Sequence, residues 1–295
     1  MAVVGYVTYN RIKAALSDSI GSSTTTYDTH LQLIALQASR IIDNFTGRSF
    51  WPEYIVRYLN GNGKSRLRIP ECMSMTTVEM SADNGYSYET LDDTDYITYG
   101  GPNEEPGQTP ITLLEMYANG SYSTWYTGQR SLKLTGLWGY HDHYADAWPS
   151  SGDSVQDAAG ISASVTTITV TDADGVDEAG QTPRFQIGQL LKIEDEHVIV
   201  TAVTASSTNQ LTVLRAQNGT TGATHAKAIP IYIYRPPEQV VFATLIQAVR
   251  MWTEGRQGFS DIGGIIELGQ LRYAQGVDPR LAALLSEAGL RRVTI

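Results

Sequence analysis

Residues 211–228, LTVLRAQNGTTGATHAKA, bring glycine, threonine, lysine and histidine into one short run. This composition is typical of a loop that holds a phosphate group or a metal ion. A phosphate-binding P-loop, however, needs the pattern G-x-x-x-x-G-K-[ST] between a strand and a helix. Here Gly219 and Gly222 are three residues apart, Lys227 follows an alanine, and strand-like sequence lies on both sides. The pattern therefore indicates a tight turn at Asn218-Gly219.

A metal site in this stretch would have to combine His225 with His197 or Glu196. The alternative is that His225 packs or caps locally, with Arg215 and His225 bracing the turn. We favour the second interpretation, because no zinc-type spacing of ligands supports the first.

The densest group of potential metal ligands is GYHDHYADAW, residues 139–148. On a strand, His141 and His143 would point to one side, as paired ligands often do. A metal ion needs further ligands at fixed geometry, and neither HExxH nor CxxC provides them. We expect a solvated loop, and the sequence leaves open whether His141, Asp142 and His143 bind a metal.

Carboxylate pairs are frequent, but none has the spacing of a known catalytic motif. Asp172 and Asp174 in TDADGVDE resemble a calcium loop only loosely, because the EF-hand pattern fails after Gly175. G-x-S-x-G is absent, and a lone cysteine, Cys72, is usually a packed hydrophobe. We expect no enzymatic activity, no cofactor and no resident metal.

Helical periodicity marks both ends of the chain. Residues 8–20 predict a short helix, and the next segment carries apolar residues at steps of three and four up to Gly47, with Asp28 or Thr29 as its cap. Helical periodicity returns at 238–255. Asp278 and Pro279 begin a last helix in DPRLAALLSEAGLRRV. The glycine-rich region 255–276 between these two helices is expected to be loose before assembly.

Alternation of period two marks the strands between these helices. We predict a hairpin over 54–71 around Gly61-Asn62-Gly63, and a second over 111–128 that turns at Asn119-Gly120. The predicted single strands are 75–82, 95–100 and 130–140.

From about residue 152 the composition shifts to Ala, Thr, Val, Ile, Gly and Asp, which predicts a compact all-β module between the linker-like segments SSGDSVQDAAG and RPPEQ. The expected class is α+β: a small helical bundle packed on a β-rich part, plus an inserted all-β domain. The expected division is 1–152 and 234–295 for the core, with the insert at 153–233.

Charge and hydropathy exclude several functions. The net charge of −10 argues against broad nonspecific binding of nucleic acid, which needs clustered Lys and Arg. No apolar run reaches the ~18 residues of a membrane span, and MAVVGYVTYNRIK does not have the pattern of a signal peptide. We therefore expect folding in a cytosolic environment. The excess of 17 tyrosines over 5 phenylalanines suits half-buried strands and wet interfaces.

The join between the second helix and the first strand pair carries a family resemblance. The stretch RIIDNFTGRSFWPEYIVRYLNGNGKSRLRIPE resembles the head-tail connector (adaptor) proteins of tailed bacteriophages, in which an apolar helix ends in "tGR.F" before a glycine-rich turn and an "L.LP" strand. Later motifs follow in family order: "dY", "vtGlwGy" and a proline-led helix. The matching residues are Thr46, Gly47, Arg48, Phe50, Gly61, Gly63, Leu67, Ile69, Pro70, Asp95-Tyr96, 134–140 with Trp138, and 237–251.

The insert departs from the small members of that family, which run almost directly from the "wGy" strand into the helix. It separately resembles a β domain of phage tail and structural proteins, of the form "tTITVtda..f..G..l.I..E.v.Vt.v....LTV.RaqnGTt...H..G". The matching residues are 167–172, Phe185, Gly188, Ile193, Glu196, Val198, Val200, 211–213, Arg215, Gly219, Thr220, His225 and Ala226, with Ala228 in place of the usual last glycine.

The resemblance implies a virion structural protein at the neck of the particle, assembled in the host cytoplasm. Adaptors form a ring, generally of twelve copies, below the portal protein, and a stopper or tail-completion protein binds the other side. DNA passes through the lumen without sequence-specific binding, and a negatively charged wall would let it slide. The insert is expected to project outward, because an inward domain would block the channel.

The resemblance also implies roles for particular residues. Gly47 would end the helix in the left-handed conformation, and Arg48 would bridge to a carboxylate or to helix-end carbonyls. Phe50 and Trp51 would pin the strand onto the helix, and Trp138 is a further fold or interface residue of the motif set. The C-terminal segment typically docks onto the portal, or else packs on its own subunit. Its candidate docking residues are Arg280, Leu281, Leu284, Leu285, Arg291 and Arg292.

An alternative hypothesis is that the chain is a tail-tip or baseplate protein with a glycan-binding β module. It depends on the tyrosine excess and on the second β module.

Overall fold

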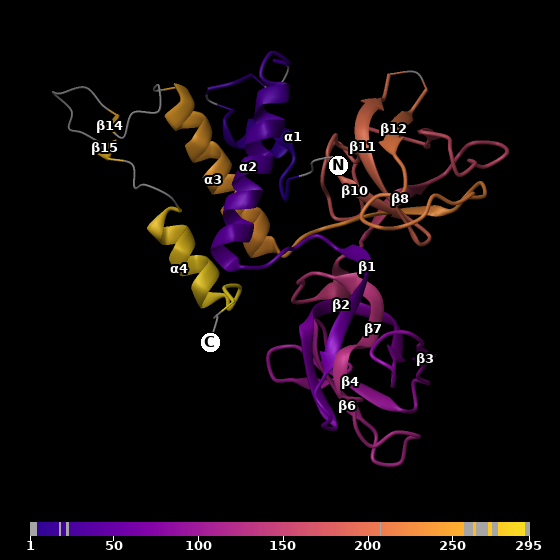
Figure 1. Ribbon diagram of the computed structural model, residues 1–295. Coiled ribbons are helices and arrows are strands. Elements are labelled where there is room, and N and C mark those ends of the chain that lie inside the picture. Colours follow the sequence, from indigo (N-terminus) through magenta and orange to yellow (C-terminus); the bar gives the residue numbers. More distant parts are fainter. Residues whose placement is uncertain are drawn as a thin grey trace. The chain divides into compact units, whose positions relative to one another are not determined.

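The computed structural model describes residues 5–17, 19–21, 24–206, 208–256, 262–263, 271–272 and 277–292. These residues form α-helices and antiparallel sheets, which confirms the predicted α+β class (Figure 1). Contacts divide the chain into two compact units. The first contains Met1–Arg48, Trp148–Gln217 and Thr221–Ile295, and the second contains Ser49–Ala147 and Asn218–Thr220. The helices and the inserted module thus share one unit, and the sheet between them in sequence forms the other.

Four helices are described in the first unit: α1 (Tyr9–Ala15), α2 (Asp28–Thr46), α3 (Glu238–Arg256) and α4 (Pro279–Glu287). α2 and α3 lie side by side, because their apolar stripes share one core with α1 (Figure 1). The residues buried in this core are Val7, Ile12, Leu16, Ile20, Leu31, Ile34, Ala35, Ala38, Ala248 and Trp252. α1 is shorter than the predicted 8–20.

The ends of the helices test the capping predictions. Gly47 follows α2 with φ of 68°, the left-handed conformation predicted for it. Asp278 caps α4 as predicted, since its side chain accepts a hydrogen bond from the Arg280 N–H. The predicted caps of α2 are wrong: the N-cap is Tyr27, which makes no side-chain capping bond, and Asp28 is already helical. Asp28 instead forms an ion pair with Lys13.

The inserted module is a six-stranded antiparallel sheet in the order β8-β13-β10-β11-β12-β9, which fits the predicted all-β character. The strands are β8 (Ser150–Ser154), β9 (Thr167–Thr169), β10 (Leu190–Ile193), β11 (Glu196–Thr204), β12 (Gln210–Leu214) and β13 (Pro230–Ile233). Part of the predicted linker SSGDSVQDAAG is therefore wrong, because Ser150–Ser154 pairs with β13. The Trp148 and Tyr234 rings meet at 4.9 Å, at the points where the chain enters and leaves this module.

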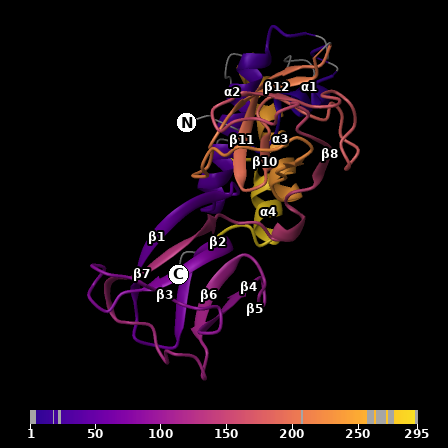
Figure 2. The ribbon, with the colours of Figure 1, turned by 90° about the vertical axis from the view of Figure 1, so that its right-hand side faces the viewer.

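The second unit is a seven-stranded antiparallel sheet in the order β1-β7-β2-β6-β4-β5, with β3 pairing β2 off this path (Figure 2). Its strands are β1 (Glu53–Gly61), β2 (Arg66–Met80), β3 (Glu89–Thr90), β4 (Tyr96–Gly100), β5 (Glu105–Pro106), β6 (Ile111–Met116) and β7 (Gly128–Trp138). A 3₁₀ turn, Tyr144–Asp146, follows β7. Alternate residues of β2, β6 and β7 bury one face around Trp125 and Trp138.

Both predicted hairpins of this unit are wrong. β1 and β2 flank the glycine-rich turn but do not pair, because β7 lies between them and pairs with both. β6 pairs with β2 and β4, and residues 121–127, the predicted second arm, form no strand before β7 begins at Gly128. The predicted strand 75–82 is the second half of β2, which continues through Pro70 with an irregular register between Arg68 and Cys72.

Two further predictions concern membrane crossing and the glycine-rich region. Among the described residues, no helix combines the length and the apolar character that a membrane crossing requires. The region 255–276 lies mostly outside the described residues. Inside it the structure assigns only the end of α3 and a two-stranded pair, β14 (Ile262–Gly263) and β15 (Leu271–Arg272).

Candidate functional site

The stretch 211–228 is organised by a buried carboxylate. Glu196, at the start of β11, has a fully buried side chain, and Arg215, just after β12, reaches it with two hydrogen bonds of 2.7 and 2.6 Å. The backbone N–H groups of Ala216 and Ala223 donate to the same carboxylate at 3.0 and 2.9 Å. Arg215 also donates to carbonyl oxygens, including that of Ala223 at 2.6 Å. One ion pair thus holds both ends of the loop 215–223.

His225 completes this cluster, which we call the Glu196 cluster (Glu194, Glu196, Arg215 and His225). The buried imidazole places Nδ1 2.7 Å from Glu194 and Nε2 2.9 Å from Glu196. Burial opposes ionisation of Glu196, but the hydrogen bonds from Arg215, Ala223 and His225 outweigh it and lower the pKa of Glu196 to about 2. Because both ring nitrogens of His225 contact carboxylates, the imidazole links Glu194 to Glu196 and holds the turn in place, as predicted.

The turn itself has the conformation predicted for it. Asn218 and Gly219 take φ of 52° and 79°, a pair of positive values typical of a tight Asn-Gly turn. The turn residues belong to the second unit by their contacts. The Asn218 carbonyl accepts the Tyr54 N–H at 2.7 Å, and a Cβ on Gly219 would lie 1.9 Å from the Tyr54 carbonyl oxygen. Glycine is required here by both the φ value and the close approach.

The other clusters considered for metal binding are also organised by internal hydrogen bonds. His141 is buried and its Nδ1 accepts the His143 N–H at 3.0 Å, whereas the His143 side chain is 77% exposed. In the acidic loop after β9, Asp172 accepts the Gly175 N–H, and Asp177 accepts from Gln181 and from Arg235. Within the part of the chain that the structure describes, no group of three or more His, Cys, Asp or Glu residues is arranged to hold a metal ion.

The motif residues Gly47 and Arg48 lie against the C-terminal segment of the same unit. Arg48 Nη1 donates to the Gly289 carbonyl just beyond α4 at 2.6 Å, and the Arg292 N–H donates to the Thr46 carbonyl at 2.7 Å. The Arg291 guanidinium lies 5.0 Å from the centre of the Phe45 ring. Of the two partners predicted for Arg48, the structure therefore shows a helix-end carbonyl, that of α4. We call this set of contacts the α2–α4 joint.

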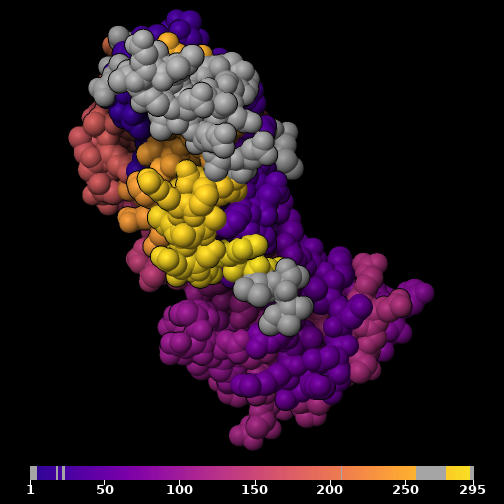
Figure 3. Space-filling view, turned by 90° about the vertical axis from the view of Figure 1, so that its left-hand side faces the viewer, coloured from indigo at the N-terminus to yellow at the C-terminus, as the bar shows by residue number. Residues whose placement is uncertain are grey.

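The candidate docking residues on α4 divide into two groups. Leu281 and Leu285 are buried against their own chain and Leu284 is half-buried, whereas Arg280, Arg291 and Arg292 are exposed. Figure 3 shows α4 in yellow at the surface, beside α3 in orange and α2 in indigo. The apolar stripe therefore packs within the subunit, and the arginines remain accessible.

Replacing Arg48 with methionine is expected to loosen α4. The change removes a charge-assisted hydrogen bond to the end of that helix, for which about 1.5 kcal/mol is typical, so amides of α4 should exchange about tenfold faster. Hydrogen-exchange mass spectrometry measures this directly. Arg40→Met removes an exposed arginine that pairs only within α2, with Asp43, and serves as the control. Equal protection of α4 in both variants would contradict the role of the α2–α4 joint.

The motif residues Phe50 and Trp138 lie in the second unit. Trp138 is buried at the end of β7, where its Nε1–H donates to the Ile55 carbonyl of β1 at 3.0 Å. The Arg57 guanidinium covers its ring at 4.6 Å. Phe50 is fully buried and meets the Tyr140 ring edge-on at 5.9 Å, while the Tyr140 N–H donates to the Ser49 carbonyl. These residues, the β1–β7 joint, fasten the strand that follows the helix to the "wGy" segment.

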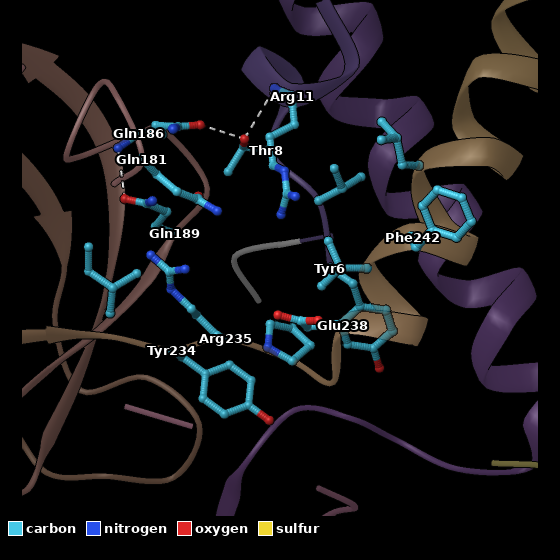
Figure 4. A pocket seen from close by; sticks show the side chains of 15 residues that line it. Tyr6, Thr8, Arg11, Gln181, Gln186, Gln189, Tyr234, Arg235, Glu238 and Phe242 are labelled. Atoms are coloured by element: carbon cyan, nitrogen blue, oxygen red, sulfur yellow. Dashed lines mark hydrogen bonds between the residues drawn. The ribbon is translucent and has the colours of Figure 1, made fainter. Parts of the chain in front are cut away.

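A cavity of about 440 Å³ in the first unit is lined by residues of the N-terminal segment, the β module and α3 (Figure 4). Arg11 and Arg235 both project into it. Burial lowers the pKa of Arg11, and the nearby Arg235 adds to the effect while Glu238 opposes it. Arg235 is held by Asp177 at 2.5 Å. The described lining includes no serine, cysteine or histidine, and its polar members are Thr8, glutamines, tyrosines, two arginines and Glu238.

Comparisons with protein-family models, with curated proteins and with solved structures find no match to this chain.

The α2–α4 joint was not anticipated from the sequence. Arg48 and Gly289 are 241 positions apart, and a carbonyl acceptor has no side-chain signature. The Glu196 cluster was anticipated in part, because Arg215 and His225 stand in one stretch, but Glu194 and Glu196 come from the β10–β11 hairpin. The contact of the Arg57 guanidinium with the Trp138 ring could not be predicted from the sequence, because it depends on the pairing of β1 with β7.

Proposed function

We propose that this chain is a virion structural protein, a head–tail connector (adaptor) of a tailed bacteriophage. The observation that carries the proposal is the position of the motif residues. Gly47 and Arg48 form the α2–α4 joint, while Phe50 and Trp138 belong to the β1–β7 joint. The residues on which the family resemblance depends therefore also connect α2 to α4 and β1 to β7.

The arrangement of the polar clusters supports a structural role. Glu196, Arg215 and His225 bind one another and the loop backbone, so their hydrogen-bonding groups are directed inward. Cys72 is buried, and burial raises the pKa of its thiol to about 12, which makes the thiolate scarce. Such groups stabilise a fold and have little capacity for turnover.

In this proposal, copies of the chain form a ring, of about twelve copies by the resemblance, between the portal and a stopper or tail-completion protein. The net charge of −10 supports a channel wall that repels the DNA backbone. The protein would be assembled in the host cytoplasm and reside at the virion neck. Because Leu281 and Leu285 are buried, the exposed Arg280, Arg291 and Arg292 are the docking candidates that the portal could reach without moving α4.

Native mass spectrometry of the purified chain, alone and mixed with the portal of the same particle, tests the proposal. A ring of defined copy number on the portal is the expected result. An Arg280→Glu/Arg291→Glu/Arg292→Glu variant should lose portal binding, and Arg40→Glu, an exposed arginine of α2, is the control. Failure of the wild type to bind any portal ring, together with selective binding on a glycan array, would favour the tail-tip alternative instead.

A further inference from the structure

The outer edge of β1 is a long, accessible strand edge. β1 has nine residues, stands at one end of the sheet and pairs only with β7. The Tyr54 N–H points away from β7, because it donates to the Asn218 carbonyl. Since backbone groups alternate in direction along a regular strand, those of Val56 and Tyr58 point the same way. The side chains of Val56 and Tyr58 are 43% and 44% exposed, so the described residues cover them only in part.

Two of the other end strands, β5 and β9, are protected. β5, at the opposite end of the same sheet, has two residues, and one of them is Pro106, which has no N–H. β9, at one end of the module sheet, has three residues, and Thr169 donates both its N–H and its hydroxyl to Asp157. Soluble proteins protect strand edges because an open edge pairs with other chains. The open edge of β1 therefore indicates a partner.

Two guanidinium groups beside this edge have no carboxylate partner among the described residues. Arg57 lies on the Trp138 ring, and its Nε is buried without a hydrogen-bond acceptor. Arg130 lies over the Tyr58 ring at 4.3 Å. By contrast, Arg66 and Arg68 of the same sheet pair with Glu115 and Glu104. A buried unpaired donor is costly, so the edge is complementary to a surface that carries carboxylates.

The opposite end of the same sheet has the complementary charge. Glu105 of β5 is exposed, and it forms no ion pair with the described residues. Figure 2 shows β1 and β5 on opposite sides of this unit. The sheet thus has an open edge with unpaired cations at one end and a protected, acidic edge at the other.

We infer that the β1 edge docks a second copy of this chain head to tail, with Arg57 and Arg130 facing Glu105 at the β5 end of the neighbour. Two different surfaces meet in such a contact, and repetition of it closes a ring when the rotation allows. The inference rests on the proposed function in that it names the contact by which the connector ring would form. The net charge of −10 makes an acidic copy of the same chain a suitable partner for a basic edge.

Two variants block the two surfaces separately. Val56→Pro removes the outward N–H and is tolerated at an edge strand, and Glu105→Arg reverses the charge at the other end. Val56→Thr keeps the N–H and is the control for the first variant. Glu178→Arg makes the same charge change on an exposed residue of the module and is the control for the second. Far-UV circular dichroism and thermal unfolding establish that each variant is folded.

Native mass spectrometry over a range of protein concentrations gives the result. The wild type and both controls are expected to form oligomers, while Val56→Pro and Glu105→Arg each remain at the subunit mass of 32.3 kDa. An equimolar mixture of the two blocked variants should form a complex that stops at two subunits, because one free edge meets one free acidic end. Blocked variants that assemble like the wild type, a mixture that stays monomeric, or a wild type that is monomeric throughout would each overturn the inference.

Failure of the β1-edge contact can be distinguished from failure of the connector proposal, because the connector proposal is tested by binding to the portal. A Val56→Pro protein that still forms a full ring on the portal would overturn the β1-edge contact and leave the connector role in place.

Discussion

A Glu196→Gln protein is expected to lose about 3 kcal/mol of the unfolding free energy of the β module. Removal of one partner from a buried ion pair is costly because the other charge stays buried and uncompensated. The Arg215 side chain is 6% exposed and the Glu196 side chain is fully buried, so water cannot replace the lost bonds. Hydrogen exchange of the β11 and β12 amides, together with urea unfolding, measures the loss for the module specifically.

Glu194→Gln is the matched control, because Glu194 is 51% exposed and contacts His225 at the edge of the cluster. Less than 1 kcal/mol is expected for it. Equal stability of the Glu196→Gln and Glu194→Gln proteins would show that the Glu196 cluster does not hold the module together.

Acid should reproduce the effect of the Glu196 substitution. The pKa of this carboxyl is about 2 in the folded protein, against an ordinary value of 4.5, so ionisation favours the folded state. The stabilisation is fully present above pH 4.5 and is lost as the pH falls toward 2, with a total of about 3 kcal/mol. The wild type should therefore lose module stability between pH 5 and pH 2 more steeply than Glu196→Gln does.

Replacing Trp138 with alanine is expected to cost about 4 kcal/mol, and to release β1 from β7. The side chain is 1% exposed, belongs to the core of the second unit and donates to the Ile55 carbonyl. Its loss leaves a large cavity, removes one hydrogen bond to the Ile55 carbonyl and removes the ring on which Arg57 lies. Urea unfolding gives the change in free energy, and hydrogen exchange of β1 localises it.

Trp138→Phe separates the two contributions. It retains most of the buried area but loses the Nε1–H, so about 1–2 kcal/mol is expected. A Trp138→Ala protein with unchanged exchange in β1 would contradict the β1–β7 joint.

Local signals in the sequence were sufficient for the helices and for single strands. The apolar stripe of α2 was predicted from its spacing because a helix buries every third or fourth residue whatever it packs against. Gly47 and Asp278 end and begin their helices by bonds to residues nearby in sequence. The Glu196 cluster was partly predictable for the same reason, since Arg215 and His225 flank the turn that they brace.

Strand partners were not predictable, because pairing depends on residues far apart in the chain. A glycine-rich turn indicated a β1–β2 hairpin, yet Trp138 on β7 bonds to Ile55 on β1 and separates the two strands. The α2–α4 joint has the same character: Arg48 binds a backbone carbonyl, which every residue carries. Every residue has a backbone carbonyl, and strand register depends on distant residues, so neither can be predicted from the residue types in a local stretch.

The meeting of the Trp148 and Tyr234 rings has a consequence for how this chain can vary. The two ends of the β module lie only 4.9 Å apart, measured between ring centres, although 86 positions separate them. A short linker could close the chain across that gap at little entropic cost, because a short loop between near neighbours is cheap to close. The chain thus enters and leaves the module at one place, where the Ile233 N–H also donates to the Pro149 carbonyl at 3.0 Å, so a protein that lacks the module would need only a short linker there.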